Sequence, residues 1–215
     1  MAPSTRRHRI PLNGIYTILD PTAADGRPLT DVLRWAHDGG GRLFQYRDKH
    51  ATALEVYRRG LPLRELAGTL GACFIVNDRC DLALALDADG VHLGQDDLPV
   101  PMARTLLGPD RLIGVSTHRP AQVTQATLEG ADYLGYGPIF GTATKSDHEP
   151  VVGLEGLRQV RGLTLLPLFA IGGIQLDAVE SIKAVGADGV AVISAIGGAA
   201  DVVKAVRGFV GRWSG

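Results

Sequence analysis

Residues 73–77 read Cys-Phe-Ile-Val-Asn and lead directly into Asp78, so that a short and almost uninterrupted apolar run ends in polar side chains. A strand that is apolar along its whole length is typical of a parallel sheet covered on both faces by helices. The same pattern recurs on both sides of this stretch. It predicts eight strands, at Ile15–Asp20, Leu43–Arg47, Cys73–Asn77, Gly90–Gly94, Leu112–Ser116, Tyr133–Gly137, Leu166–Gly172 and Gly189–Ala195.

Segments of helical character separate these strands. Pro120 and Asp177 stand where the first turn of a helix accepts them, and the phrases Gly130-Ala131-Asp132 and Gly186-Ala187-Asp188 lead from a helix end into a strand. The predicted helices are Leu29–Asp38, Leu54–Leu70, Val100–Leu107, Pro120–Glu129, Leu154–Arg161, Asp177–Val185 and Ala199–Trp213. Repeated strand and helix units in 215 residues predict an α/β fold, a single-domain (β/α)8 TIM barrel.

The main alternative is an open, doubly wound sheet. That fold places a Gly-x-Gly-x-x-Gly turn after its first strand, whereas this chain has Leu19-Asp20-Pro21-Thr22 there. We therefore favour the barrel. We expect residues 1–11 to be a disordered tail and residues 12–215 to be the catalytic barrel. The basic string Arg6-Arg7-His8-Arg9 is interpreted as a solvated chain end rather than a nucleic-acid arm.

Composition limits the classes of partner. With 45% hydrophobic residues, 21% charged residues and a formal net charge of -1, the chain has no general basic field, which argues against nucleic-acid or membrane partners. Cys73 and Cys80 match neither a disulfide framework nor a zinc pattern and are interpreted as structural. The run Ile15–Leu19 is too short for a signal peptide or a membrane span, so we expect a cytoplasmic protein. Nothing in the pattern specifies an oligomeric state.

Chemistry in such a barrel lies on the loops after the strands. Behind the second strand, Gln45, Arg47 and Lys49 alternate with Tyr46 and Asp48, so the first three are predicted to face one pocket. A guanidinium and an ammonium group suit a polyphosphate. A solvated loop with an Arg–Asp pair is the alternative.

Carboxylates follow the third and fourth strands. Asn77 and Asp78 end one strand, while Asp96 and Asp97 follow the next, so the acids are expected at one rim of the barrel. Mg²⁺ takes oxygen ligands, commonly one or two carboxylates completed by water and substrate phosphate. We predict Asp78 and Asp97 as ligands, with Asp96 as the alternative to Asp97. A helix-capping role is open for each acid taken separately.

Later strand ends carry hydroxyls, histidines and a lysine. Ser116 ends the fifth strand, but no Ser/His/Asp arrangement surrounds it, and His92 and His118 are more often structural than acid–base groups. The segment Gly137–Lys145 carries Thr142, Thr144 and Lys145 and is interpreted as an anion clamp, with a plain surface loop as the alternative.

Glycines follow the seventh and eighth strands. Gly172-Gly173 and Gly197-Gly198 let backbone N–H groups approach a phosphate, which barrels of this kind often bind between these two loops. Simple tight turns are the alternative. Together with the polyphosphate site, this predicts two phosphorylated small-molecule substrates. The economical reaction transfers the group attached to a diphosphate onto the second ligand.

The motifs, in this order, resemble those of the thiamine-phosphate synthase family over about residues 12–210. The resemblance is carried by Gln45-x-Arg47-x-Lys49, Val76-Asn77-Asp78-Arg79, Gly90-Val91-His92-Leu93-Gly94-Gln95-Asp96-Asp97, Gly114-Val115-Ser116, Gly137-Pro138-Ile139-Phe140-x-Thr142-x-Thr144-Lys145, Ile171-Gly172-Gly173-Ile174 and Ile193-Ser194-Ala195-Ile196. It implies a transferase of thiamine biosynthesis. The reaction would join hydroxymethylpyrimidine diphosphate to hydroxyethylthiazole phosphate, giving thiamine phosphate and diphosphate by Mg²⁺-assisted dissociative substitution.

The resemblance also implies residue roles. The pyrimidine diphosphate would be bound by Gln45, Tyr46, Arg47, Asp48, Lys49, Asn77, Ser116 and Lys145, and the thiazole phosphate by Thr142, Ala143, Thr144, Gly173, Ile193 and Ser194. Asp78 and Asp97 would hold the metal, and Arg47, Lys49, Ser116 and Lys145 would act in catalysis. Two rivals are a thiazole tautomerase, which needs no diphosphate site, and a non-catalytic barrel that binds thiamine phosphates and regulates a partner.

Overall fold

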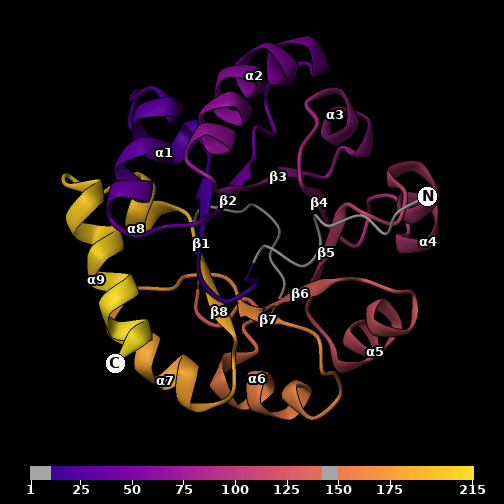
Figure 1. The fold of residues 1–215 in the computed structure, drawn as a ribbon. Coiled ribbons are helices and arrows are strands. Elements are labelled where there is room, and N and C mark those ends of the chain that lie inside the picture. Colours follow the sequence, from indigo (N-terminus) through magenta and orange to yellow (C-terminus); the bar gives the residue numbers. More distant parts are fainter. Residues whose placement is uncertain (1–10, 142–149) are drawn as a thin grey trace.

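The computed structural model describes residues 11–141 and 150–215 and shows a closed parallel barrel surrounded by helices (Figure 1). Successive strands pair in chain order, and β8 closes the barrel by pairing with β1. The predicted TIM barrel is confirmed. Its strands are β1 (Gly14–Leu19), β2 (Leu43–Tyr46), β3 (Cys73–Asn77), β4 (Gly90–Leu93), β5 (Leu112–Thr117), β6 (Tyr133–Tyr136), β7 (Leu168–Ala170) and β8 (Gly189–Val192).

A ring of helices packs around the barrel (Figure 1). In the described part of the chain these are α1 (Leu29–Asp38), α2 (Ala53–Thr69), α3 (Cys80–Ala85), α4 (Val100–Leu107), α5 (Pro120–Leu128), α6 (Gly153–Arg161), α7 (Val179–Ala184), α8 (Ser194–Gly197) and α9 (Val202–Ser214), with 3-10 turns η2 (Pro21–Ala23) and η3 (Leu176–Ala178). Within the described residues, none of the helices has the length and apolar character needed to cross a membrane.

Three elements, β7, β8 and α9, depart clearly from their predicted bounds. Strand β7 is limited to three residues, because Pro167 precedes it and the chain turns at Gly172 (φ +88°). Strand β8 ends at Val192, since the chain enters the short helix α8, which the sequence pattern did not predict. Helix α9 begins at Val202 rather than at position 199, because the Asp201 carboxylate accepts the backbone N–H of Lys204 at 2.9 Å as an N-cap. The six-residue helix α3 was also missed.

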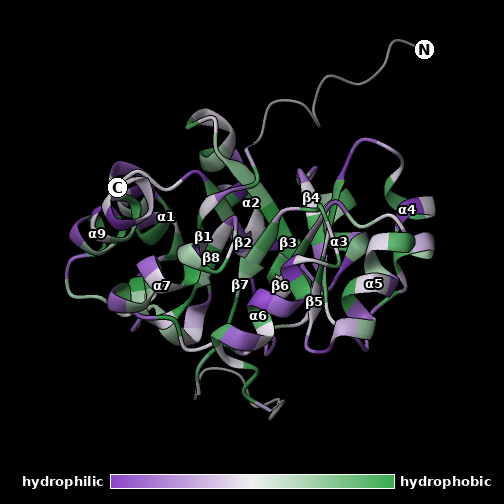
Figure 2. Cartoon of the chain, turned by 90° about the horizontal axis from the view of Figure 1, so that it is seen from below, coloured by the Kyte–Doolittle hydropathy of each residue, from purple (hydrophilic) through white to green (hydrophobic). Residues whose placement is uncertain are grey.

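Apolar side chains fill both the space between the strands and helices and the inside of the barrel. Figure 2 shows hydrophobic strands within helices whose outer faces are polar. Tyr133 and Phe169 are fully buried inside the barrel. Neighbouring glycines make room for these rings, because a Cβ at Gly114 would lie 2.1 Å from Cζ of Tyr133, and one at Gly189 2.4 Å from Cε1 of Phe169. The inside of the barrel is therefore filled at these places by large aromatic rings packed against glycines, rather than by side chains of similar size.

The two Gly-Ala-Asp phrases connect the amino-terminal ends of neighbouring strands. Asp132 accepts the N–H of Ile113 at 2.8 Å, and Asp188 accepts the N–H of Leu168, also at 2.8 Å. Each carboxylate is also paired with an arginine from a surrounding helix, Arg104 at 2.5 Å and Arg161 at 2.7 Å respectively. These contacts lie at the end of the barrel opposite the predicted site, where structural roles are expected.

Candidate active site

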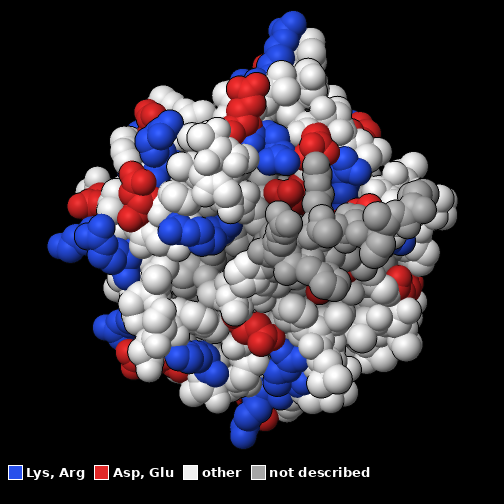
Figure 3. All heavy atoms as spheres, viewed as in Figure 1, with Lys and Arg blue, Asp and Glu red and all other residues white. Residues whose placement is uncertain are grey.

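Two adjoining cavities open at the carboxyl ends of the strands, at the rim the sequence predicted. One encloses about 690 Å³ of space that is partly open to solvent, is mainly apolar and extends between β1, β7 and β8. The other, of about 980 Å³, is lined by the acids and cations that follow β2, β3 and β4. Acidic and basic side chains lie next to each other near the middle of this face (Figure 3). The cavities share Arg47, His92, Ser116, Ile171 and Gly172.

In the charged cavity, cations and carboxylates are in contact. Lys49 Nζ lies 2.8 Å from Asp78 Oδ2. Asp78 follows β3 in a left-handed conformation (φ +61°), and its N–H donates to His92 O at 2.8 Å. Asn77 lines the same cavity. The predicted proximity of Lys49, Asn77 and Asp78 is therefore present in the structure.

Asp97 lies against Asp78. Its Oδ2 accepts the N–H of Gly94 at 2.6 Å, and its carboxyl group neighbours that of Asp78. Burial and the neighbouring Asp78 carboxylate raise the pKa of Asp97, although the Gly94 N–H opposes this. Asp96, the alternative ligand, lines the same cavity but is exposed.

This donor set fits a hard divalent cation. A positive ion placed between two neighbouring carboxylates would offset their mutual repulsion. Across residues 11–141 and 150–215 there is no cluster of three or more potential His, Cys, Asp or Glu ligands. A cation bound here would take its remaining ligands from water and from substrate oxygens, which is the habit of Mg²⁺.

Arg47 has a partner that the sequence analysis missed. Its Nη1 makes an ion pair with Asp20 Oδ2, and the side chains of Arg47 and Asp20 are only 12% and 2% exposed. The other oxygen of Asp20 accepts the N–H and hydroxyl of Thr22, at 2.9 and 2.6 Å. Asp20 therefore holds Arg47 at the rim. In the sequence, the turn residues Leu19-Asp20-Pro21 were used only to exclude another fold. An acidic residue directly after a predicted strand was a signal that could have pointed to this partner.

Tyr46 and Asp48 point away from the cavities, as their alternation with Arg47 predicted. Tyr46 is 1% exposed and belongs to the core between strands and helices. Asp48 Oδ2 pairs with Arg59 Nη1 at 2.9 Å. Any contact of these two residues with a ligand would therefore use their backbone.

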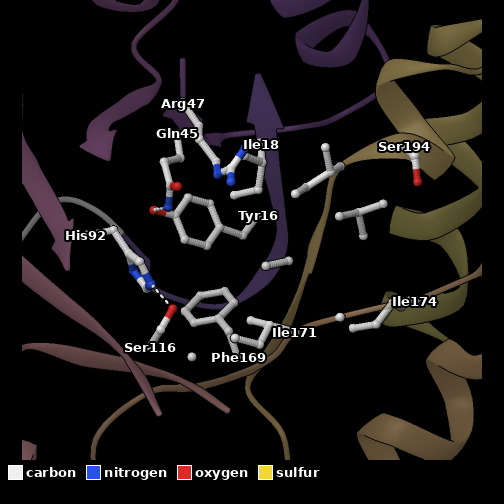
Figure 4. Close-up of a pocket in the computed structure, with 16 residues that line it drawn as sticks. Tyr16, Ile18, Gln45, Arg47, His92, Ser116, Phe169, Ile171, Ile174 and Ser194 are labelled. Carbon is white, nitrogen blue, oxygen red and sulfur yellow. Dashed lines mark hydrogen bonds between the residues drawn. The ribbon is translucent and has the colours of Figure 1, made fainter. Parts of the chain in front are cut away.

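Polar side chains line one wall of the apolar cavity, among them Gln45 with Tyr16 and His92 with Ser116 (Figure 4), and the buried Tyr133 connects these two pairs. Gln45 Nε2 donates to Tyr16 Oη at 2.8 Å, and Tyr16 Oη lies 2.8 Å from Tyr133 Oη. Tyr133 Oη lies 3.1 Å from His92 Nδ1, and His92 Nε2 lies 2.9 Å from Ser116 Oγ. The predicted residues Gln45 and Ser116 are thus connected through three others that were not predicted as site residues.

Backbone groups form the far end of this cavity. Gly173, Ile193 and Ser194, predicted for a phosphate, all line it. Gly173 is left-handed (φ +65°), and a Cβ there would lie 2.5 Å from the carbonyl oxygen of Gly141, so this position requires glycine. Arg27, missed by the sequence analysis, donates to Gly197 O at 2.5 Å and to Ala199 O at 2.7 Å. It holds the carboxyl end of α8 in place.

Four predicted residues lie outside the described part of the chain: Thr142, Ala143, Thr144 and Lys145. Their roles stay predictions. His118 lines the charged cavity, and its Nδ1 lies 2.6 Å from Gly137 O, a contact that suits a structural role. Gln95, which was not predicted, donates to Ser116 O at 2.7 Å and links the loop after β4 to β5.

Comparison with known proteins identifies the family. The pattern described as thiamine monophosphate synthase matches residues 15–196. The chain belongs to this family. Among its members, the thiamine-phosphate synthase of Moorella thermoacetica is 48% identical over 193 residues, covering 90% of this chain and 92% of that protein. The thiamine-phosphate synthase of Chloroflexus aurantiacus is 47% identical, covering 90% and 89% of the two chains.

A solved structure from the same family has the same architecture. The thiamine phosphate pyrophosphorylase of Pyrococcus furiosus aligns with a TM-score of 0.87 and 39% identity, covering 95% of this chain and 96% of that one. The family resemblance noted in the sequence is therefore confirmed along nearly the whole barrel.

Proposed function

We propose that this protein is a transferase that joins hydroxymethylpyrimidine diphosphate to hydroxyethylthiazole phosphate, forming thiamine phosphate and diphosphate. One observation carries the proposal. A cavity lined by cations and paired acids adjoins an apolar cavity whose far end is lined by the loops after β7 and β8, and the two cavities share a wall. Membership of the thiamine monophosphate synthase family supports the same reaction.

The charged cavity suits the diphosphate. Arg47 presents a guanidinium that Asp20 orients, and Lys49 presents an ammonium beside Asp78. Both cations stabilise negative charge that grows on a departing diphosphate. Mg²⁺ held by Asp78 and Asp97 would neutralise diphosphate oxygens and help the leaving group depart. The residues bind and orient, and none of them needs to act as a nucleophile.

The apolar cavity suits two flat rings. Tyr16, Ile18, Phe169 and Ile171 form its walls, and their apolar surface excludes water from the reacting carbon. Gly173 and Ser194 line the far end of this cavity, and the backbone N–H groups of such loops suit a phosphate monoester. The exocyclic carbon of the pyrimidine loses diphosphate, and the thiazole nitrogen attacks that carbon. The electron-rich aminopyrimidine stabilises the cation, so no general base is required.

A thiazole tautomerase is the second candidate. It would use the apolar cavity and the phosphate end, but it has no use for the contact of Lys49, Asp78 and Asp97. A regulatory barrel would bind the ligands without turnover. The acid pair together with the two cations therefore favours the synthase.

The test is turnover by the purified protein. Hydroxymethylpyrimidine diphosphate, hydroxyethylthiazole phosphate and Mg²⁺ are mixed with it, and thiamine phosphate is followed by its oxidised fluorescence. Product that disappears with EDTA and with Asp78→Ala supports the reaction and the metal assignment. Folded protein that binds the thiazole phosphate but forms no product would reject the synthase in favour of the tautomerase or the regulatory barrel.

A further inference from the structure

The hydrogen-bond chain inside the barrel has two ends, and both face the cavity. Gln45 and Ser116 line the cavity, whereas Tyr133, in the middle of the chain, does not and is 0% exposed. Tyr133 Oη is the bridge, since it lies 2.8 Å from Tyr16 Oη and 3.1 Å from His92 Nδ1. The chain thus runs from one ligand-facing amide, through buried groups, to one ligand-facing hydroxyl.

The Gln45 amide favours one direction for the protons along these hydrogen bonds, whose other contacts allow either direction. Each phenol has a single proton, and a neutral imidazole has one N–H. Because Gln45 Nε2 is the atom that donates to Tyr16 Oη, the Tyr16 proton is available for Tyr133, and the Tyr133 proton for His92 Nδ1. An accepting Nδ1 leaves the imidazole proton on Nε2, which donates to Ser116 Oγ. The Ser116 proton is then directed away from His92, toward the cavity.

The opposite end of the chain is an acceptor. Tyr16 accepts one of the two Nε2 protons of Gln45, and the acceptor of this amide, Oε1, has no hydrogen bond to any other described residue. The single side-chain polar atom among the described residues that is both fully buried and unpartnered is Thr17 Oγ1. Gln45 Oε1 is therefore not sealed in but open to the cavity that the residue lines.

We propose that Tyr133 and His92 are positioning residues that set the polarity of the cavity, with an acceptor at Gln45 Oε1 and a donor at Ser116 Oγ. This polarity selects a heterocycle with an exocyclic amino group over its counterpart with an oxo group. An amino group donates to Gln45 Oε1, whereas an oxo group places one acceptor against another. The ligand class rests on the proposed function, which supplies the aminopyrimidine.

The reverse direction would have the opposite consequence. If His92 Nδ1 carried the proton, the chain would run toward Gln45 Oε1, and the amide would turn its N–H₂ toward the ligand. The cavity would then favour the oxo compound. Successive hydrogen bonds strengthen one another in a low-dielectric interior. The direction of the protons is therefore a property of the whole hydrogen-bond chain rather than of one residue.

The experiment measures discrimination in Tyr133→Phe. Values of kcat/KM are obtained for the amino and oxo pyrimidine diphosphates, and their ratio is compared with that of the unaltered enzyme. The folded fraction of a variant scales both of its kcat/KM values and drops out of their ratio. The difference in intrinsic reactivity between the two compounds is the same for every variant and drops out when the ratios are compared. We expect the preference for the amino compound to fall by about tenfold or more. Tyr136→Phe is the matched control, since Tyr136 lies on the same strand but in the core outside the barrel.

A ratio that is unchanged in Tyr133→Phe would overturn the proposal. If the unaltered enzyme turned over neither compound, the proposed function would fail. A second measurement would still test the direction of the hydrogen-bond chain. The ¹⁵N chemical shifts of His92, assigned by comparison with His92→Gln, report which nitrogen carries the proton. The Nε2-protonated form is expected, with a change of tautomer population in Tyr133→Phe. The Nδ1-protonated form would refute the assigned direction.

Discussion

Replacing Asp20 with Asn tests whether a buried acid orients the arginine of the diphosphate site. The substitution removes the charge facing Arg47, while Asn can still offer one oxygen to Thr22. Removing one partner of a buried ion pair costs about 3–5 kcal/mol. Arg47 opens to the cavity, where solvent screens it, so we expect a loss of about 2–3 kcal/mol in the free energy of unfolding. For a chain of 215 residues this corresponds to a fall of about 4–12 °C in Tm.

The assay is urea unfolding, together with KM for the pyrimidine diphosphate. We expect KM to rise, because Arg47 is no longer held at the rim, and we expect inorganic diphosphate with Mg²⁺ to recover part of the lost stability. Asp201→Asn is the control, since Asp201 caps α9 by accepting the N–H of Lys204. Asn and Asp cap almost equally well, so its effect is expected to stay below about 0.5 kcal/mol. A similarly small effect of Asp20→Asn on both stability and KM would refute the reasoning.

Three further predictions concern the metal pair, the thiols and α8. Asp97→Asn is expected to abolish Mg²⁺-dependent thermal stabilisation without lowering the Tm of the metal-free protein, because it removes a negative charge that lies against Asp78. A clearly lower metal-free Tm in differential scanning fluorimetry would contradict this. Burial raises the pKa of both Cys73 and Cys80, so stability is expected to be fully present below the unfolded thiol pKa, about 8.5, and to fall as the pH rises above it. In the native protein neither thiol should react with a disulfide reagent, and rapid labelling of the folded chain would show that the burial is wrong. Arg27→Met is expected to weaken thiazole-phosphate binding about tenfold or more in calorimetry, because the end of α8 loses the hydrogen bonds to Gly197 O and Ala199 O, and one charged hydrogen bond is worth about 1.5–3 kcal/mol. Unchanged affinity would exclude α8 as part of that site.

Much of the active rim could be predicted from local sequence. The alternation of Gln45, Arg47 and Lys49 around Tyr46 and Asp48 decides which side chains share a face, since successive residues on a strand point to opposite sides. The structure has this division, with Arg47 and Lys49 in the cavities and Tyr46 in the outer core. Strand order in a barrel then brings the acids after β3 and β4 close to these cations.

The partners of these residues could not be predicted in the same way. Asp20 meets Arg47 across 27 positions, Arg27 meets Ala199 across 172, and Tyr16 meets Tyr133 across 117. No periodicity links positions so far apart, and each residue taken alone has an ordinary local explanation. Tyr16 and Tyr133 in particular lie within predicted strands, and no role was predicted for either.

The sequence by itself determined the alternating architecture, the rim at which chemistry occurs and the types of side chain available there, because these depend on short-range patterns and on strand direction. Tertiary structure alone decided how those side chains are held. Closure of the barrel places β1 beside β8 and turns Tyr16, Tyr133 and His92 toward one interior. Hydrogen bonds and ion pairs require atoms within about 3 Å, and only the closed barrel brings distant parts of the chain to that separation.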